Sequence, residues 1–142
     1  MPDIRHSLQI SASPEAIYPL VSTASGFAQW WSQDVSASDG LVELGFFHRA
    51  TIYRLRRHSA EPPHRIEWLC ESGKEWAGTR LLFHLEPVKA GTLVRFTHAG
   101  WELDTDYYIS CTTVWGELMF RLRAAAEGHP QGPLFLSNSL AY

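Results

Sequence analysis

The chain has 142 residues, of which 45% are hydrophobic and 19% charged, and its formal net charge is −3 at neutral pH. This length suits one domain, and the composition excludes a fully disordered chain and a charge-rich coiled coil. Because positive charge is not in excess, we expect neither nucleic acid nor an anionic membrane surface as a partner. Aromatic residues reach 13%, so one small interior must accommodate many wide rings.

The N-terminal residues and the two cysteines indicate the compartment. The first residues lack the basic and apolar regions of a secretory signal, and no apolar run is long enough to cross a bilayer. Cys70 and Cys111 lie in apolar segments and outside any C-x-x-C motif. We therefore expect two buried thiols in a cytoplasmic protein, and a disulfide only if the fold brings them together.

The N-terminal third predicts one strand followed by two short helices. Residues 4–10 alternate between apolar and polar, as in a half-buried strand. Residues 13–15, Ser-Pro-Glu, form a helix start, because serine caps, proline suits the first turn and glutamate complements the helix dipole. Residues 25–31 predict a second short helix, and the polar residues 32–40 a loop after it.

Five further segments predict strands, and the short breaks between them favour an antiparallel meander over βαβ units. Alternation is clearest in residues 79–86, and their hairpin partner places Phe96 and His98 on one face. The predicted strands cover residues 41–49, 51–58, 65–70, 79–86 and 92–98.

The period becomes helical over residues 104–127, with apolar side chains at intervals of three and four. A helix of this length can cross a whole sheet. We therefore predict an α+β fold, in which a strongly twisted antiparallel sheet of six or seven strands grips one long C-terminal helix. The apolar stripe consists of Tyr108, Cys111, Trp115, Leu118, Met119, Leu122 and Ala126.

Several motifs occur together in an order and spacing that are typical of one superfamily. They are residues 13–18, Phe27 with Trp30 and Trp31, residues 86–87 with 91–92, residues 97–101, and Trp115, Leu118, Leu122 and residues 127–128. On these motifs, residues 4–128 resemble the START-like, Bet v 1-like (SRPBCC) superfamily, and within it the bacterial relatives of the activator of the Hsp90 ATPase. The resemblance implies a helix-grip fold that encloses a cavity between the sheet and the long helix.

The sequence departs from this family in two respects. Val114 precedes Trp115 where the family usually has glycine, and its bulk is expected to alter the contact between helix and sheet. The N-terminal module of the eukaryotic co-chaperone is not found in the sequence, so the resemblance does not imply an Hsp90-type chaperone as a partner.

The chain divides into a START-like domain, residues 1–128, and a C-terminal tail, residues 129–142. Prolines and glycine at 130–133 cannot continue the helix. Residues 134–136 and Leu140 are too apolar for a solvated end, so the tail should lie against its own domain or a second copy. Of these, a homodimer is slightly favoured, because a symmetric pair is the commonest way to cover such a patch.

Seven side chains are candidate ligand contacts. Aromatic residues on the expected inner faces either pack an ordinary core or, as the resemblance implies, line the cavity. His98 points inward as a satisfied core histidine or as a group that orients a ligand. The candidates are Trp31, Trp68, Phe83, Phe96, His98, Trp115 and Met119.

Motifs for catalysis and for metal binding do not occur. There is no G-x-S-x-G, no glycine-rich phosphate loop and no H-E-x-x-H, and the histidines are scattered. Arg54, Arg56, Arg57 and Arg65 form a local basic patch that fits a solvated mixed face better than phosphate recognition. We therefore expect no catalytic residues, no metal and no cofactor.

Three functions fit the sequence. The first is a protein that binds a small hydrophobic or amphipathic molecule between the sheet and the C-terminal helix. The second, from the superfamily, is a cyclase- or hydrolase-like enzyme for a small aromatic substrate, which needs several convergent polar groups. The third is a module that contacts a chaperone or another partner through its apolar tail.

Overall fold

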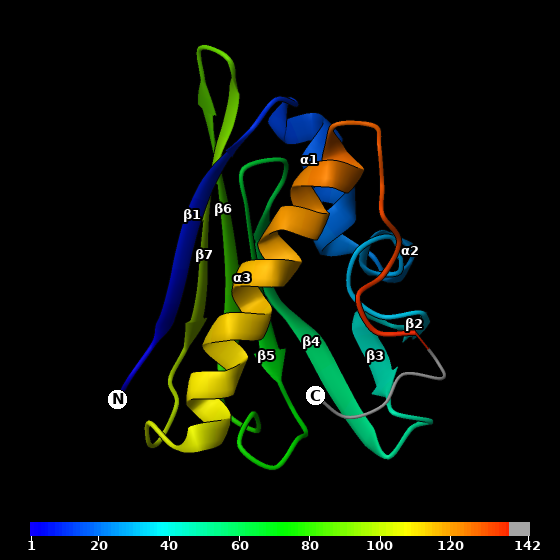
Figure 1. The fold of residues 1–142 in the computed structure, drawn as a ribbon, viewed down its shortest axis with the longest axis vertical. Helices are drawn as coiled ribbons and strands as arrows, with labels where there is room; N and C mark the ends of the chain where they lie inside the picture. The colour runs from blue at the N-terminus through cyan, green and yellow to red at the C-terminus, as the bar shows by residue number, and fades with distance from the viewer. Residues whose placement is uncertain (137–142) are drawn as a thin grey trace.

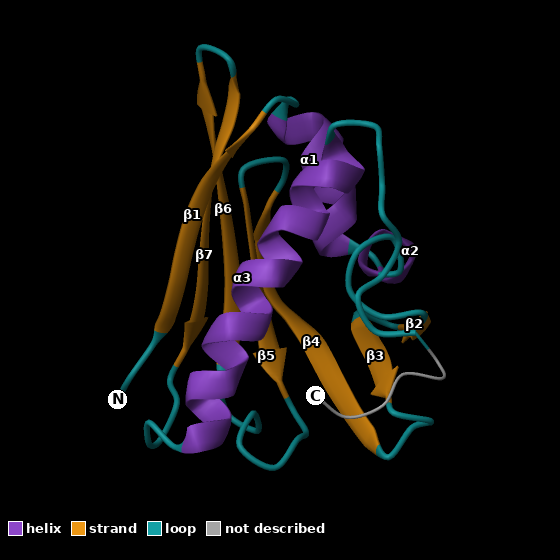
Figure 2. Cartoon of the chain, in the orientation of Figure 1, coloured by secondary structure: helices purple, strands orange, loops and turns teal. Residues whose placement is uncertain are grey.

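The computed structural model describes residues 1–136, which form one antiparallel sheet of seven strands and three helices (Figures 1 and 2). In chain order the elements are β1 (Ile4–Ile10), α1 (Pro14–Ser22), α2 (Ala24–Phe27), β2 (Asp34–Ser38), β3 (Leu41–Phe46), β4 (Thr51–Glu61), β5 (Arg65–Cys70), β6 (Arg80–Val88), β7 (Gly91–Ala99) and α3 (Asp106–Ala126).

The strands are arranged in the order β1-β7-β6-β5-β4-β3-β2, so the first strand of the chain lies at one edge beside the last. The helices α1 and α2 form the connection from this edge to β2 at the other. The predicted α+β fold with two short helices and a long C-terminal helix is thus confirmed.

Strand β2 lies where the sequence predicts only a loop. Val35 pairs with Leu44 of β3, and the ladder runs from Asp34 to Ser38. This edge strand is largely exposed and rich in serine. It therefore lacks the apolar alternation that marks a half-buried strand, and backbone hydrogen bonds to β3 define it instead.

The inner face of the sheet follows the predicted alternation. Phe83 pairs with Phe96, and Leu81 lies between His98 and Trp68 in one cross-strand row. All five side chains are at most 1% exposed. The inward direction predicted for these positions is therefore confirmed. Cys70 and Cys111 are buried free thiols, also as predicted.

Helix α3 crosses the sheet diagonally in front of the strands (Figure 1). It begins after Thr105, whose hydroxyl caps the helix by accepting from the backbone N–H of Tyr108. Its backbone packs against β1 and α1. The N-terminal half of α3 therefore faces the strands β3 and β4 through its side chains, with no close backbone packing of these elements.

Residues 129–136, here called the C-terminal strap, run from the end of α3 to α2 and β2 (Figure 1). The N–H of Phe135 donates to the carbonyl of Trp31 at 3.0 Å, and the N–H of Gln33 donates to the carbonyl of Phe135 at 2.9 Å. Phe135 itself is buried. This part of the predicted tail packs on its own domain, whereas Leu140 lies outside the described residues.

Candidate functional site

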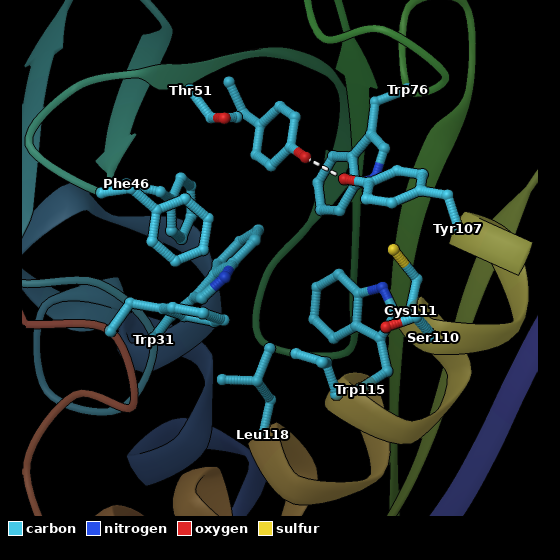
Figure 3. Close-up of a pocket in the computed structure, with 13 residues that line it drawn as sticks. Trp31, Phe46, Thr51, Trp76, Tyr107, Ser110, Cys111, Trp115 and Leu118 are labelled. Atoms are coloured by element: carbon cyan, nitrogen blue, oxygen red, sulfur yellow. Dashed lines mark hydrogen bonds between the residues drawn. The ribbon is translucent and has the colours of Figure 1, made fainter. Parts of the chain in front are cut away.

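A pocket of about 250 Å³ lies between the N-terminal half of α3, the strands β3 and β4, the β5–β6 loop and the C-terminal strap (Figure 3). Segments far apart in the sequence thus meet around one space. The lining residues are Trp31, Phe46, Phe47, Thr51, Tyr53, Trp76, Tyr107, Ser110, Cys111, Val114, Trp115, Leu118 and Phe135.

Aromatic rings form most of the pocket wall. Trp76 lies flat on Tyr53, with ring centroids 3.9 Å apart and planes within 1°. The rings of Trp31 and Trp115 are 5.0 Å apart and tilted. Both contacts bury large apolar ring faces, and the tilted pair of Trp31 and Trp115 has a centroid distance that is favourable for aromatic pairs. The wall is therefore wide, apolar and built from several independent elements.

Gly73 in the β5–β6 loop allows the Tyr53 ring to take its place in this wall. Its φ is +107°, and an added Cβ would lie 2.6 Å from Cε1 of Tyr53. A side chain at this position would therefore strain the backbone and collide with the ring. The glycine gives the loop room to fold over β4 and bring Trp76 onto Tyr53.

The β5–β6 loop is also fixed to α3. The hydroxyl of Thr105, the N-cap residue, donates to the Glu75 carboxylate at 2.6 Å. Glu75 precedes Trp76 in the loop, and Thr105 lies two residues before Tyr107. The hydrogen bond therefore fixes the loop side of the pocket relative to the helix side.

Hydroxyl groups provide most of the polarity of the pocket. Tyr53 and Tyr107 hydrogen-bond to each other through their hydroxyls, and Thr51 and Ser110 add two more hydroxyls (Figure 3). The thiol of Cys111 lies on the same side, and burial raises its pKa above the usual value. Among the lining residues that the structure describes, none carries a charge.

His98 lies behind the pocket wall in a closed hydrogen-bond chain. Nε1 of Trp115 donates to Nδ1 of His98 at 3.1 Å, and because an indole N–H can only donate, Nδ1 is unprotonated. Nε2 of the neutral ring then donates to the Thr79 hydroxyl at 2.8 Å, which donates to the Trp76 carbonyl at 2.6 Å. Burial lowers the pKa of His98 from 6.5 to about 3. His98 therefore orients Trp115 as a neutral acceptor.

The structure brings two of the seven candidate residues to the pocket, Trp31 and Trp115. The other five are buried behind it, where they pack against neighbouring side chains: Trp68, Phe83, Phe96, His98 and Met119. Two of these contact the pocket wall from behind: the ring of Phe96 packs 4.2 Å from that of Trp115, and His98 is hydrogen-bonded to Trp115.

Sequence reasoning missed most of the pocket wall, although part of it carried a signal. Cys111 and Leu118 lie on the predicted helix stripe, and Tyr53 alternates with arginines in the predicted strand of residues 51–58. Trp76 follows a glycine-containing turn, where no periodicity indicates direction. Phe135 was expected to need cover, but nothing in the sequence places it beside the helix and β3.

Comparison with known families gives a match over most of the chain. The profile of the family described as Activator of Hsp90 ATPase homolog 1-like protein matches residues 11–127. The chain belongs to this family. Three elements of the pocket, β3, β4 and α3, lie within the matched residues, and the strap follows them.

Solved structures share the fold. The solution structure of the Aha1 dimer from Colwellia psychrerythraea is 31% identical, with a TM-score of 0.80, over 91% of this chain and 98% of that one. A Staphylococcus saprophyticus protein is 15% identical, with a TM-score of 0.76, over 96% and 99%. An AHSA1-like protein from Rhizobium etli is 21% identical, with a TM-score of 0.69, over 99% and 92%.

A comparison with curated proteins gave no significant match. Within residues 1–136, no helix has the length and apolarity required to span a membrane. The same residues contain no group of three or more histidine, cysteine or acidic side chains that could hold a metal ion.

Proposed function

We propose that the protein binds a small, uncharged, hydrophobic or amphipathic molecule in the pocket between α3 and the β3–β4 side of the sheet. The observation that carries this proposal is the lining itself, with aromatic rings around most of the space, a group of hydroxyls and no charged side chain among the described lining residues. Pockets for small molecules commonly combine an apolar wall with a few polar groups.

The lack of charge favours neutral ligands over anionic ones. A carboxylate in this space would lose its hydration without gaining a cationic partner, which is costly. The hydroxyls of Tyr53 and Tyr107 can instead face the polar end of an amphipathic molecule. Trp31 and Trp115 would contact its apolar part, and His98 would act indirectly, by holding Trp115 in place.

A fluorescence titration with prodan, a neutral naphthalene ketone whose emission shifts to the blue in apolar surroundings, tests the proposal. We expect saturable binding to the folded protein with a stoichiometry of one. Val114→Phe should remove this binding, because Val114 lines the pocket and a larger ring would fill it.

Thr113→Phe is the matched control, since Thr113 is the neighbouring residue on α3 and is exposed outside the pocket. It should leave prodan binding unchanged. Equal loss from the two substitutions, or no saturable binding by the native protein, would contradict the proposed function.

The enzyme alternative receives less support from the same residues. Burial raises the pKa of Cys111, so its thiol stays protonated and is a poor nucleophile. His98 cannot serve as its base, because both ring nitrogens are bonded within the protein. Binding without reaction is therefore the function that the pocket supports best.

The predicted homodimer and cytoplasmic location form part of the proposal. The Colwellia psychrerythraea relative is described as a dimer, which supports the first. Light scattering coupled to size-exclusion chromatography tests it, and a monomer mass across the accessible concentration range would overturn it. Cell fractionation tests the location.

A further inference from the structure

We infer that Phe135, which lies on the C-terminal strap, sets the upper size limit of the ligand. This inference rests on the proposed function, because it concerns the wall of the same pocket. Phe135 is one of the lining residues. It would therefore be a specificity-determining residue contributed from outside the sheet and helices that build the rest of the site.

The strap holds this ring in a defined position. Besides the two hydrogen bonds of Phe135 to the α2–β2 connection, the N–H of Leu134 donates to the carbonyl of Trp30 at 3.3 Å. The guanidinium of Arg121 on α3 donates to the carbonyl of Gly132 at 3.1 Å. The strap is therefore fixed to the helix on one side of Phe135 and to the α2–β2 connection at Phe135 itself.

The ring of Phe135 closes the pocket against β3. It meets Phe46 edge to face, with centroids 5.1 Å apart, and Phe47 in the same manner at 5.8 Å. Phe135 as a whole residue is 7% exposed. Because aromatic rings pack tightly at such distances, a ligand cannot extend in this direction while the ring is in place.

Phe135 lies on a segment that is separate from the sheet and the helices. The family match ends at residue 127, so the strap follows the matched residues. A pocket whose wall is supplied by a short segment after the last helix can change its capacity without any change in the sheet or in α3. The strap would thus adapt a common pocket to a ligand of one size.

A size-selectivity experiment tests this inference with prodan and laurdan, which carry the same neutral fluorophore on a short and on a long acyl chain. The native protein should prefer prodan. Phe135→Ala should shift the ratio of the two affinities toward laurdan by about tenfold, in the range that pocket shape alone provides. Phe135→Leu, which keeps an apolar anchor for the strap, should shift it in the same direction by less.

Leu136→Ala is the matched control, because Leu136 neighbours Phe135 on the strap but does not line the pocket. It should leave the ratio unchanged. Circular dichroism of each variant establishes that the fold is retained, and Phe135→Leu carries the test if Phe135→Ala does not fold.

The outcomes separate the two proposals. An unchanged ratio in the folded Phe135 variants, or an equal shift in Leu136→Ala, would overturn the role of Phe135 while prodan binding upholds the proposed function. Failure of the native protein to bind either probe would overturn both.

Discussion

The interior has two halves that differ in the hydrogen-bond partners of their tryptophan N–H groups. In the packed half, between α1 and strands β5–β7, the indole N–H groups of Trp30 and Trp68 donate to the carbonyls of Leu20 and Val21 at 2.8 and 3.0 Å. In the pocket half, between α3, β3 and β4, Nε1 of Trp115 donates to the His98 side chain at 3.1 Å, and Nε1 of Trp76 donates to no backbone carbonyl of the described residues.

The difference shows that aromatic content alone does not decide where a pocket forms. The last turn of a helix leaves carbonyl groups without partners in the helix, and those of α1 lie where tryptophan N–H groups can satisfy them. The pocket half is closed by a loop and a strap instead of a helix end. Rings there stack on one another, and space is left between them.

The largest effect that tests this comparison comes from a matched pair of truncations. Phe83→Ala in the packed half should lower the free energy of unfolding by about 3–5 kcal/mol, because it leaves a closed cavity. Phe46 in the pocket half is also buried, but Phe46→Ala should lower the free energy of unfolding by at least about 1 kcal/mol less than Phe83→Ala does. The reason is that the vacated space joins an existing pocket. Urea denaturation measures both, and equal costs would show that the halves do not differ.

His98, at the boundary of the halves, should make stability depend on pH. Its folded-state pKa of about 3 lies below the ordinary value of 6.5. The contribution of neutral His98 to the free energy of unfolding is therefore complete above pH 6.5 and is lost as pH falls toward 3. In that interval the free energy of unfolding falls with a slope approaching about 1.4 kcal/mol per pH unit. Urea denaturation at several pH values measures this slope.

His98→Gln, which can keep an acceptor for Trp115 but does not titrate, provides the comparison. The native protein should lose more stability than this variant between pH 6.5 and pH 4. If the two curves run parallel over that interval, His98 is not held neutral by the fold.

A loop substitution tests whether Gly73 is required for the pocket wall. Gly73→Ala should destabilise the protein by about 1–3 kcal/mol, because the positive φ is strained and the new methyl group meets Tyr53. Gly78→Ala is the control, since its φ of +89° is similarly restrictive but nothing lies within 4 Å of the added Cβ. Thermal unfolding should show a lower melting temperature for Gly73→Ala than for Gly78→Ala. The reverse order would show that contact with the Tyr53 ring does not explain the requirement for Gly73.

The smallest effect concerns the attachment of the strap. Arg121→Ala should cost about 0.5–1.5 kcal/mol and speed amide exchange at Phe135, because the hydrogen bond to the Gly132 carbonyl is lost. Arg123→Ala, at a site where the guanidinium lies over the exposed Phe120 ring, should not alter exchange at Phe135. Amide exchange rates measured by NMR in the two variants test this prediction. The same acceleration at Phe135 in both variants would mean that Arg121 does not fix the strap.

The sequence by itself determined the fold class and the direction of the inner-face side chains. Alternation of apolar and polar residues places Phe83, Phe96 and His98 on one face, because successive strand residues point to opposite sides. The helical stripe that contains Trp115 and Leu118 follows from the same local geometry. Each of these predictions depends on residues that are neighbours in one element, and the structure confirms them.

Only the tertiary structure decided which buried residues line the pocket. Periodicity shows that a side chain points inward but not how far the opposite layer stands from it. Because α3 packs its backbone against β1 and α1, Phe83 and Phe96 lie in the packed half, whereas Tyr53 and Phe46 face the open space. Trp76 lies in a loop, where no periodic pattern of apolar residues indicates the direction of a side chain.

The strap shows the same limit most clearly. Its apolar residues indicate that it must be covered, because exposing such side chains to water is unfavourable. Which surface covers it depends on the hydrogen-bonding groups left free between α2 and β2, and these exist only once the sheet has formed. The sequence therefore predicts that Phe135 is buried against a surface, and the tertiary structure makes that surface the wall of the pocket.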